Sequence, residues 1–177
     1  KVLQSFMFNK VDKTKKKRTV TYRESTLENF GRIFSPEELP KYSGKISKFC
    51  NIVKKSKGII LIYSQFIDGG CVPIALALEE IGIRRYGDDQ KSLFSPAPVP
   101  DFQITGKSGK TTSAKYVMIT GDPNYSGVAS NKIELKACTD SGNINGEKVK
   151  VIIISKAGTE GLDFKNIRQV HILEPWF

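Results

Sequence analysis

The segment formed by residues 155–164, Ser-Lys-Ala-Gly-Thr-Glu-Gly-Leu-Asp-Phe, carries the residue types best suited to chemistry in this chain. Small residues and two glycines at the carboxyl end of a buried parallel strand let a main chain approach a ligand, at the place where open α/β sheets bind. Thr159 supplies a hydroxyl for a phosphate oxygen, and Asp163 can accept a hydrogen bond from a ribose hydroxyl. A plain strand-to-helix turn explains the glycine content equally well, so the residues alone leave both interpretations open.

A second phosphate-binding pattern to consider is Gly109-Lys110-Thr111, because a P-loop ends in Gly-Lys-Ser/Thr and cradles phosphate with main-chain amides and a lysine. That pattern requires a glycine five residues before Gly109, where this chain has Ile104. The sequence shows neither a preceding strand nor a clear following helix. We therefore expect a loop here and not a Walker A motif.

The histidine and cysteine content gives no support to metal or thiol chemistry. The single histidine, His171, lies in a strand-like run, where a lone histidine is usually a packed side chain, so we assign it no catalytic role. The three cysteines, Cys50, Cys71 and Cys138, are far apart and set among apolar neighbours. They suggest neither a disulfide framework nor a zinc site. A reducing intracellular setting without metal ligands is the expectation.

Four runs of β-branched and other apolar residues predict the strands that would position these groups: residues 58–63, 116–119, 149–154 and 170–173. Near-continuous apolar strands are typical of a parallel sheet covered on both faces. Helical patterns are present at residues 70–81, where Pro73 lies early and Gly82 follows, and at residues 128–138. A further amphipathic helix at residues 46–53 precedes the first strand. This alternation predicts an α/β fold built from βαβ units.

The chain divides into two parts by its pattern. Residues 1–40 are expected to form a peripheral N-terminal extension, with a short strand at residues 19–22 and a helix start at residues 35–38. Residues 41–177 form the main domain. Within it, proline, glycine, serine and lysine are frequent between about residues 88 and 115, which predicts a loop insertion that is long and flexible.

Composition favours a polyanionic partner. The 177-residue chain has 28 Lys and Arg against 18 Asp and Glu, a net charge of +10, which suits nucleic acid or nucleotide phosphates. The basic run at residues 10–18 is more often a solvated charge cluster than a binding element. No apolar stretch approaches the ~20 residues that span a bilayer, so we expect a soluble protein without a membrane partner. The abrupt start at Lys1 and end at Phe177 are typical of a piece of a longer protein.

Residues 155–164 and the following Lys-Asn-Ile-Arg-Gln-Val-His-Ile-Leu-Glu-Pro-Trp-Phe (165–177) resemble motif V and the next strand of superfamily-two helicases. The likeness is greatest to the C-terminal RecA-like domain of helicase-like NTPases of large nucleocytoplasmic DNA viruses, of the mimivirus, asfarvirus and poxvirus type. Residues 59–66, Ile-Ile-Leu-Ile-Tyr-Ser-Gln-Phe, resemble motif IV, and residues 118–122, Met-Ile-Thr-Gly-Asp, resemble the strand ending in Thr-Gly. The resemblance implies a RecA-like three-layer sandwich with a mainly parallel central sheet over residues 41–177.

Site residues follow from this resemblance. It implies sequence-independent contacts to the phosphates of single-stranded DNA or RNA by six residues: Ser64, Gln65, Thr120, Gly121, Gly158 and Thr159. It also implies that Gly161 and Asp163 face ATP across a cleft shared with the first RecA-like domain of the same chain, with Asp163 toward the ribose. We expect Tyr63 and Phe66 to pack in the core instead of stacking on a base.

The chain ends before the family's Gln-x-x-Gly-Arg-x-x-Arg motif VI, whose arginines engage the nucleotide phosphates. It also lacks the Walker A lysine and the acidic pair of the first domain. The resemblance therefore implies that the parent is an ATP-dependent helicase or translocase using ATP and Mg²⁺. The fragment itself is expected to hold no catalytic residue, to bind no cofactor stably and to be inactive. A viral parent would act in the host cytoplasm or be carried in the virion.

Two other classes of protein remain as alternatives. A Rossmann-like or phosphoribosyl-transferring enzyme is suggested by Asp68-Gly-Gly70 and by Gly158-x-x-Gly161. The dinucleotide pattern Gly-x-Gly-x-x-Gly is incomplete here, and Asp68 has no adjacent acid to hold a metal-bound pyrophosphate. The other alternative is a basic nucleic-acid-binding module without catalytic activity, which the net charge alone would allow.

Overall fold

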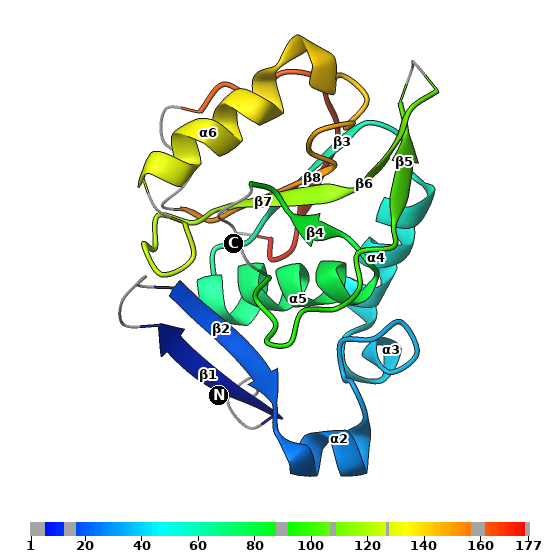
Figure 1. Ribbon diagram of the computed structural model, residues 1–177, viewed down its shortest axis with the longest axis vertical. Coiled ribbons are helices and arrows are strands. Elements are labelled where there is room, and N and C mark those ends of the chain that lie inside the picture. The colour runs from blue at the N-terminus through cyan, green and yellow to red at the C-terminus, as the bar shows by residue number, and fades with distance from the viewer. Residues whose placement is uncertain are drawn as a thin grey trace.

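The computed structural model describes residues 6–12, 17–87, 92–106, 109–126, 128–156 and 162–175. Its centre is a five-stranded sheet in the order β4-β7-β8-β3-β9, of which Figure 1 labels β4, β7, β8 and β3. The strands are β3 (Ile59–Tyr63), β4 (Arg84–Arg85), β7 (Lys115–Ile119), β8 (Val151–Ile154) and β9 (Ile167–Ile172). Neighbouring strands are parallel throughout this sheet. The predicted α/β, RecA-like class with a mainly parallel central sheet is confirmed, and the strand order differs from the 3-2-1-4-5-6 of dinucleotide-binding folds.

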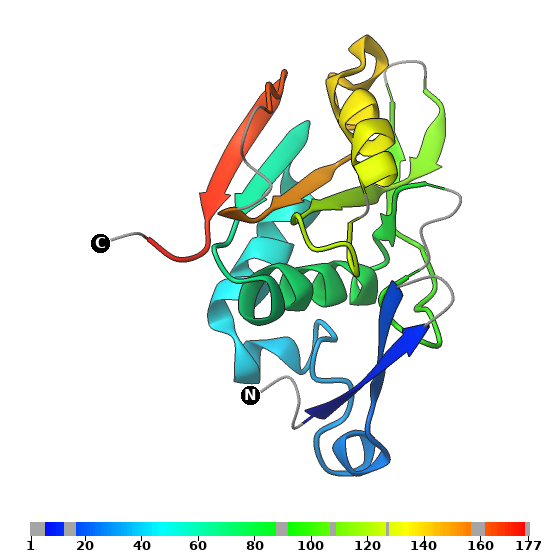
Figure 2. The same cartoon turned by 90° about the vertical axis from the view of Figure 1, so that its left-hand side faces the viewer.

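Helices lie on both faces of this sheet. Figure 2 shows α4 (Gly44–Lys55) and α5 (Val72–Glu80) on one side and α6 (Val128–Thr139) on the other. Successive strand residues point to opposite faces, so the strands contribute to two hydrophobic clusters. The face toward α4 and α5 is formed by Ile60, Ile62, Met118, Val151 and Ile153. The face toward α6 is formed by Ile59, Leu61, Val117, Ile119, Ile152 and Ile154.

The three predicted helices are confirmed, and local sequence explains their ends. The hydroxyl of Ser43 caps α4 by accepting the N–H of Ile46 at 3.3 Å. A π-helical turn, η1 (Ile67–Cys71), leads into α5, which has Pro73 in its first turn. Gly82 follows α5 with φ of 88°, a left-handed conformation that glycine adopts without steric cost. Sequence signals therefore placed this helix to within two residues.

The N-terminal part contains a hairpin of β1 (Met7–Asp12) and β2 (Lys17–Tyr22), then α2 (Glu24–Phe30) and α3 (Leu39–Tyr42). The strand expected at residues 19–22 is confirmed. Regular helix begins at Leu39, although the hydroxyl of Ser35 accepts the N–H of Glu38 at 3.3 Å. Val20, 2% exposed, belongs to the same hydrophobic cluster as the central sheet. The described part of residues 1–40 thus contributes to the main core, and the division into two parts remains a prediction.

Part of the predicted insertion at residues 88–115 packs against this N-terminal hairpin. The N–H of Val20 donates to the carbonyl of Leu93 at 2.7 Å, and the ring of Tyr22 stacks on that of Phe94 with centroids 5.2 Å apart. Two further strands, β5 (Gln103–Thr105) and β6 (Thr111–Ser113), pair as an antiparallel hairpin. In the described residues this segment therefore contains regular structure and buried side chains.

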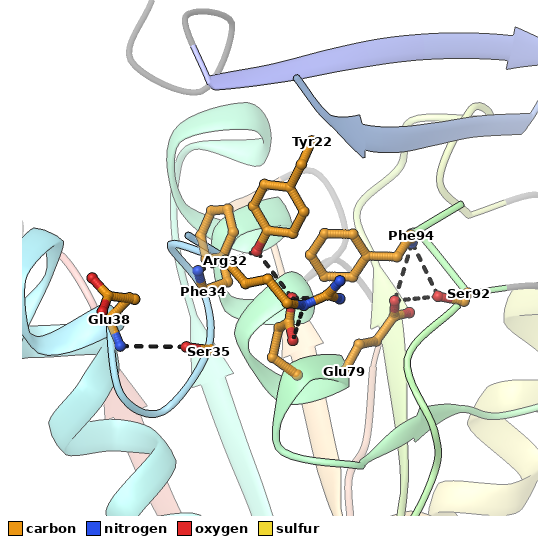
Figure 3. A network of polar contacts seen from close by, with 9 residues as sticks. Tyr22, Arg32, Phe34, Ser35, Glu38, Glu79, Ser92 and Phe94 are labelled. Atoms are coloured by element: carbon orange, nitrogen blue, oxygen red, sulfur yellow. Dashed lines mark hydrogen bonds and ion pairs between the residues drawn. The ribbon is translucent and has the colours of Figure 1, made fainter. Parts of the chain in front are cut away.

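Two adjacent acidic residues of α5, Glu79 and Glu80, hold these peripheral segments to the central fold. Figure 3 labels Glu79 with its partners Ser92 and Phe94. Glu80 accepts from the Arg32 guanidinium, with a closest distance of 2.9 Å, and from the Tyr22 hydroxyl at 3.0 Å. Burial, followed by the nearby Glu80 carboxylate, raises the pKa of the Tyr22 hydroxyl. The Arg32 guanidinium also lies 5.2 Å from the centre of the Tyr22 ring. These contacts join the N-terminal part to α5 through an ion pair between the exposed Arg32 side chain and the buried Glu80 carboxylate.

The neighbouring Glu79 is 3% exposed and connects α5 to both the insertion and β7. Its carboxylate accepts from the Tyr116 hydroxyl at 2.7 Å, from the Leu93 N–H at 2.9 Å and from the Phe94 N–H at 3.1 Å. The Ser92 hydroxyl also donates to it. Desolvation raises the pKa of Glu79, while these four donors oppose the shift. A single buried carboxyl group therefore satisfies four donors from two segments.

The edge strand β9 departs from the predicted pattern. Its residues alternate between half-buried and exposed, and Val170 and Ile172 are each 63% exposed. Full coverage on both faces, which the apolar run predicts, is therefore wrong for this strand. The reason is that α6 packs over β7, β8 and β3, whereas on the opposite face the His171 ring meets Phe49 of α4 at 5.1 Å.

Substitution Glu79→Ala should lower the free energy of unfolding by about 3 kcal/mol, because it leaves the Tyr116 and Ser92 hydroxyls and the Leu93 N–H without their acceptor. Urea unfolding at neutral pH measures the change. Glu38→Ala is the control: Glu38 forms an ion pair with a Lys41 side chain that is 65% exposed, and its loss should have little effect on stability. Equal effects of the two substitutions would contradict the assigned role of Glu79.

Candidate nucleic-acid interface

Three strands end at the same level of the sheet, and each is followed by a residue with a hydroxyl group. Ser64 follows β3, Thr120 follows β7 and Ser155 follows β8. The N–H of Ser64 donates to Ile154 O at 3.1 Å, and the N–H of Ser155 donates to Ile119 O at 3.2 Å. The Ser155 hydroxyl donates to Thr120 O at 2.7 Å. The structure therefore brings motif IV, the Thr-Gly segment and the start of motif V to one carboxyl edge, where open α/β sheets bind ligands.

Thr120 is fully buried and organises the turn after β7. Its N–H donates to the Ser126 hydroxyl at 3.0 Å, and the two hydroxyls lie 2.9 Å apart. The Thr120 hydroxyl also accepts the N–H of Asp122 at 3.3 Å. Gly121, by contrast, is exposed and has a φ of 73°, in the left-handed region. Within this pair, the main chain of Gly121 is the part open to a ligand.

Ser64 and Gln65 are held by an acidic residue that the motif comparison did not single out. Glu174, just beyond β9, accepts the Ser64 hydroxyl at 3.0 Å and the Gln65 N–H at 3.3 Å. Ser64 is fully buried, and its hydroxyl also lies 3.0 Å from Phe66 O, a second acceptor. The sequence contained a signal for Glu174, because this residue directly follows a predicted parallel strand. Residues that follow neighbouring parallel strands lie at the same edge of the sheet.

The two aromatic residues of motif IV have different surroundings. Tyr63 is half-buried and packs against the hydrophobic cluster beneath α6, as expected. Phe66 is 54% exposed, so the expectation that it packs in the core is wrong. That expectation assumed continued strand alternation, whereas β3 ends at Tyr63 and the Ser64 hydroxyl accepts the N–H of Phe66 at 3.2 Å, which turns the chain.

The loops after β3 and β7 are connected to each other and to the N-terminal hairpin. The Tyr125 hydroxyl donates to Asp68 at 3.0 Å, and the Arg18 guanidinium lies 3.9 Å from the same carboxylate oxygen. The Arg18 N–H donates to Asn124 O at 3.3 Å. Burial raises the pKa of Tyr125 to about 12, so its hydroxyl remains a proton donor at neutral pH. Arg18, predicted as part of a solvated cluster, is therefore attached to this edge.

On the nucleotide side, the structure describes only part of motif V. Gly158, Thr159 and Gly161 lie outside the described residues, so their predicted roles remain predictions. Asp163 is exposed. Its neighbours Leu162 and Phe164 are partly buried against the hydrophobic cluster beneath α6, which directs the intervening carboxylate toward solvent.

Gly109-Lys110-Thr111 does not have the setting of a P-loop. Gly109 lies between β5 and β6 with φ of 76°, its N–H donates to Gly106 O at 3.0 Å, and the Gly106 N–H donates to Lys110 O at 2.9 Å. The tripeptide thus forms part of an antiparallel hairpin turn, whereas a P-loop joins a strand to a helix. A strand, β5, does precede the tripeptide, which the sequence did not indicate, but a second strand and not a helix follows it, so the rejection of a Walker A motif holds.

Thiol and metal chemistry have no basis in the described residues. The three cysteines are free, and burial raises the pKa of each thiol to about 12. Over the same residues no cluster of three or more His, Cys, Asp or Glu side chains is arranged to hold a metal ion. No helix in the described part of the chain has the length and apolar character needed to cross a membrane.

The main chain at Gly70 packs tightly against the side chains of Ser64 and Glu174. A Cβ atom at Gly70 would lie 1.9 Å from the Ser64 Oγ and 3.2 Å from the Glu174 Oε1. Gly70→Ala should therefore destabilise the fold by about 1–3 kcal/mol, because the buried Ser64 cannot move away without losing its hydrogen bonds. Gly69→Ala is the matched control, since its Cβ would meet only Phe66 Cβ at 3.7 Å. Chemical denaturation of both variants tests this, and equal stability of the two would contradict the packing described.

No family model matches the chain, and no solved structure matches it significantly. A "Termination factor NPH-I homolog" of African swine fever virus is 32% identical over 169 residues, covering 80% of this chain and 22% of that protein. Two proteins of Acanthamoeba polyphaga mimivirus, named as predicted ATP-dependent RNA helicases, are 26% and 28% identical over 79% and 75% of this chain.

The chain spans about a fifth of the length of these relatives. The relatives come from the groups of viruses to which the motifs in residues 59–66, 118–122 and 155–177 pointed. Their similarity extends over most of the chain and is not limited to one glycine-rich segment. The chain is therefore homologous to the helicase-like proteins of large DNA viruses.

Proposed function

We propose that this chain is the second RecA-like domain of an ATP-dependent nucleic-acid helicase or translocase. The observation that carries the proposal is the convergence of Ser64, Thr120 and Ser155 at one carboxyl edge, joined by the Ser155–Thr120 hydrogen bond of 2.7 Å. These residues come from three separate motif-like segments. The relatives named as RNA helicases and as a termination factor support a helicase-like role for the longer protein.

In this proposal the edge binds the sugar-phosphate backbone of a single strand of DNA or RNA. The accessible main chain of Gly121 and the half-buried Gln65 supply donors, while Ser64 and Thr120 shape the turns that carry them. Gly158 and Thr159 complete the same row of contacts. Phosphate contacts of this kind position a strand without reading its sequence, and a chain with net charge +10 favours such binding.

The other side of motif V serves the nucleotide. Gly161 and the exposed Asp163 complete an ATP site whose phosphate- and Mg²⁺-binding groups belong to the first RecA-like domain, with Asp163 bonding the ribose. Because residues 155–164 are continuous, a change on the nucleotide side is transmitted directly to Thr159 on the strand side. Closing and opening of the two domains around ATP would then move the second domain along the strand. The isolated chain would not hydrolyse ATP.

Asp163→Ala in the full-length protein should lower nucleic-acid-stimulated ATP hydrolysis by about tenfold or more, because a ribose hydrogen bond to a charged acceptor is lost. Steady-state ATPase assays with and without single-stranded DNA or RNA measure this effect. Lys165→Ala, which removes another exposed charge two residues away, is the control and should leave turnover near normal. Unchanged stimulated turnover in the Asp163 variant would refute the nucleotide role of this segment.

Glu174→Gln should tighten binding of the 177-residue chain to single-stranded oligonucleotides by roughly two- to fivefold at low salt, because it removes a negative charge beside the bound phosphates. Glutamine keeps an acceptor for the Ser64 hydroxyl. Glu147→Gln, before the amino end of β8 and thus at the opposite edge, makes the same change in net charge and serves as the control. Fluorescence anisotropy across a salt series measures the affinity of both variants for the oligonucleotide. An equal gain in affinity for the two would show that the nucleic acid does not bind at the edge that carries Glu174.

A further inference from the structure

A groove lies between α4 and the edge strand β9. It consists of two adjoining hollows of about 450 and 200 Å³, whose linings share Lys48 and Ile52. The smaller hollow extends to Lys45 and Leu173, and the larger one extends to Lys55 at the end of α4. At a rise of about 1.5 Å per residue, the helix from Lys45 to Lys55 is about 15 Å long. The groove therefore runs along most of α4.

The outer wall of this groove is basic because of the residue spacing in α4. Lys48, Asn51 and Lys55 are three or four residues apart, so they lie on one face of the helix, and all three are exposed. Lys57, just after the helix, is also exposed and extends the row. Among the described residues, none of these three lysines forms an ion pair and no acidic residue lines either hollow. The groove thus presents a row of positive charges to solvent.

The polar groups of the larger hollow are held in place by hydrogen bonds. The Gln169 amide donates to the Ser56 hydroxyl at 3.0 Å, and that hydroxyl donates to Ile52 O at 2.6 Å. The buried Lys150 donates to the carbonyl of Ser56 and so adds a fixed positive charge beneath the hollow. Phosphate oxygens only accept hydrogen bonds, which suits a surface where lysine ammonium groups and side-chain amides are exposed.

The groove meets the carboxyl edge of the sheet at Lys45. The Lys45 ammonium group donates to Leu173 O at 2.8 Å. The next residue, Glu174, accepts the Ser64 hydroxyl and the Gln65 N–H at that edge. A nucleic-acid strand bound at the carboxyl edge can therefore continue into the groove without leaving the protein surface.

We propose that this groove binds a further stretch of the sugar-phosphate backbone of the nucleic acid that the carboxyl edge holds, with Lys48, Lys55 and Lys57 on its phosphates. This inference rests on the proposed function and extends the nucleic-acid interface along α4. The contacts are independent of base sequence, because lysine meets phosphate as a point charge. The charges alone would also accept an acidic peptide, and continuity with the carboxyl edge is the observation that favours nucleic acid.

Fluorescence anisotropy of the 177-residue chain with single-stranded oligonucleotides of about 6 and about 20 nucleotides tests the proposal, since the longer one can occupy both the carboxyl edge and the groove. The double variant Lys48→Gln/Lys55→Gln should weaken binding of the longer oligonucleotide by roughly fivefold at low salt. It should also reduce the slope of log affinity against log salt concentration by about 0.7 for each lysine. Binding of the shorter oligonucleotide should change by less than about twofold.

The double variant Lys54→Gln/Lys136→Gln is the matched control, because it removes the same charge from exposed positions outside the groove. Lys54 belongs to α4 but interacts electrostatically with Glu37, and Lys136 belongs to α6 on the other face of the sheet. This control should leave both the affinity and the salt slope close to those of the parent chain. Urea unfolding checks that both double variants remain folded, as expected for substitutions of exposed lysines.

The groove proposal is overturned if the two double variants weaken binding of the longer oligonucleotide equally, or if the groove variant weakens both oligonucleotides equally. It is also overturned if polyglutamate displaces the longer oligonucleotide as well as an unlabelled oligonucleotide of equal charge does, because the groove would then suit an acidic peptide. In each of these cases, tighter binding by Glu174→Gln would still support the carboxyl edge. If the parent chain binds neither oligonucleotide, the proposed nucleic-acid interface fails together with the groove.

Discussion

Parallel pairing of β8 with β3 on one side and β7 on the other places the ends of three strands side by side. The register pairs Ile154 with both Tyr63 and Ile119, so the next residue of each strand emerges at one edge. Sliding β8 by one residue would pull the flanking Lys150 and Ser155 away from their acceptors, Ser56 O and Thr120 O, which disfavours any other register. The arrangement of motif-like segments therefore rests on the pairing of β8.

Around this sheet, buried carboxylates carry much of the cohesion between segments distant in the chain. Glu79 joins α5 to β7 and to the segment beginning at Ser92, and Glu80 joins α5 to Arg32 and Tyr22. In a low-dielectric interior such groups stabilise only when their partners are all present. Two neighbouring acids on one helix thus couple the N-terminal hairpin and the insertion to the central fold.

The carboxyl edge carries acidic side chains, although the chain as a whole is strongly basic. Although the chain has a net charge of +10, Glu174 and Asp68 both lie at this edge. Each is engaged, Glu174 with Ser64 and Gln65, and Asp68 with Tyr125 and Arg18. These acids hold the loops in shape while reducing the positive potential that would meet a polyanion. Binding of a strand would then depend on main-chain donors at least as much as on bulk charge.

Sequence alone determined four of the five strands of the central sheet, the three helices that cover it and the α/β class, because these depend on periodicities within a few residues. It did not predict the short strands β4, β5 and β6. It also identified the three motif-like segments and excluded Gly109-Lys110-Thr111 as a P-loop. Tertiary structure decided which side chains are accessible: it buried Ser64 and Thr120, exposed Phe66 and attached Arg18 to Asp68. The contact between Ser64 and Glu174 spans 110 positions of sequence. Local patterns place Glu174 after a strand but do not identify the neighbouring strand, since the contact arises only when β9 pairs with β3 and sets their ends together.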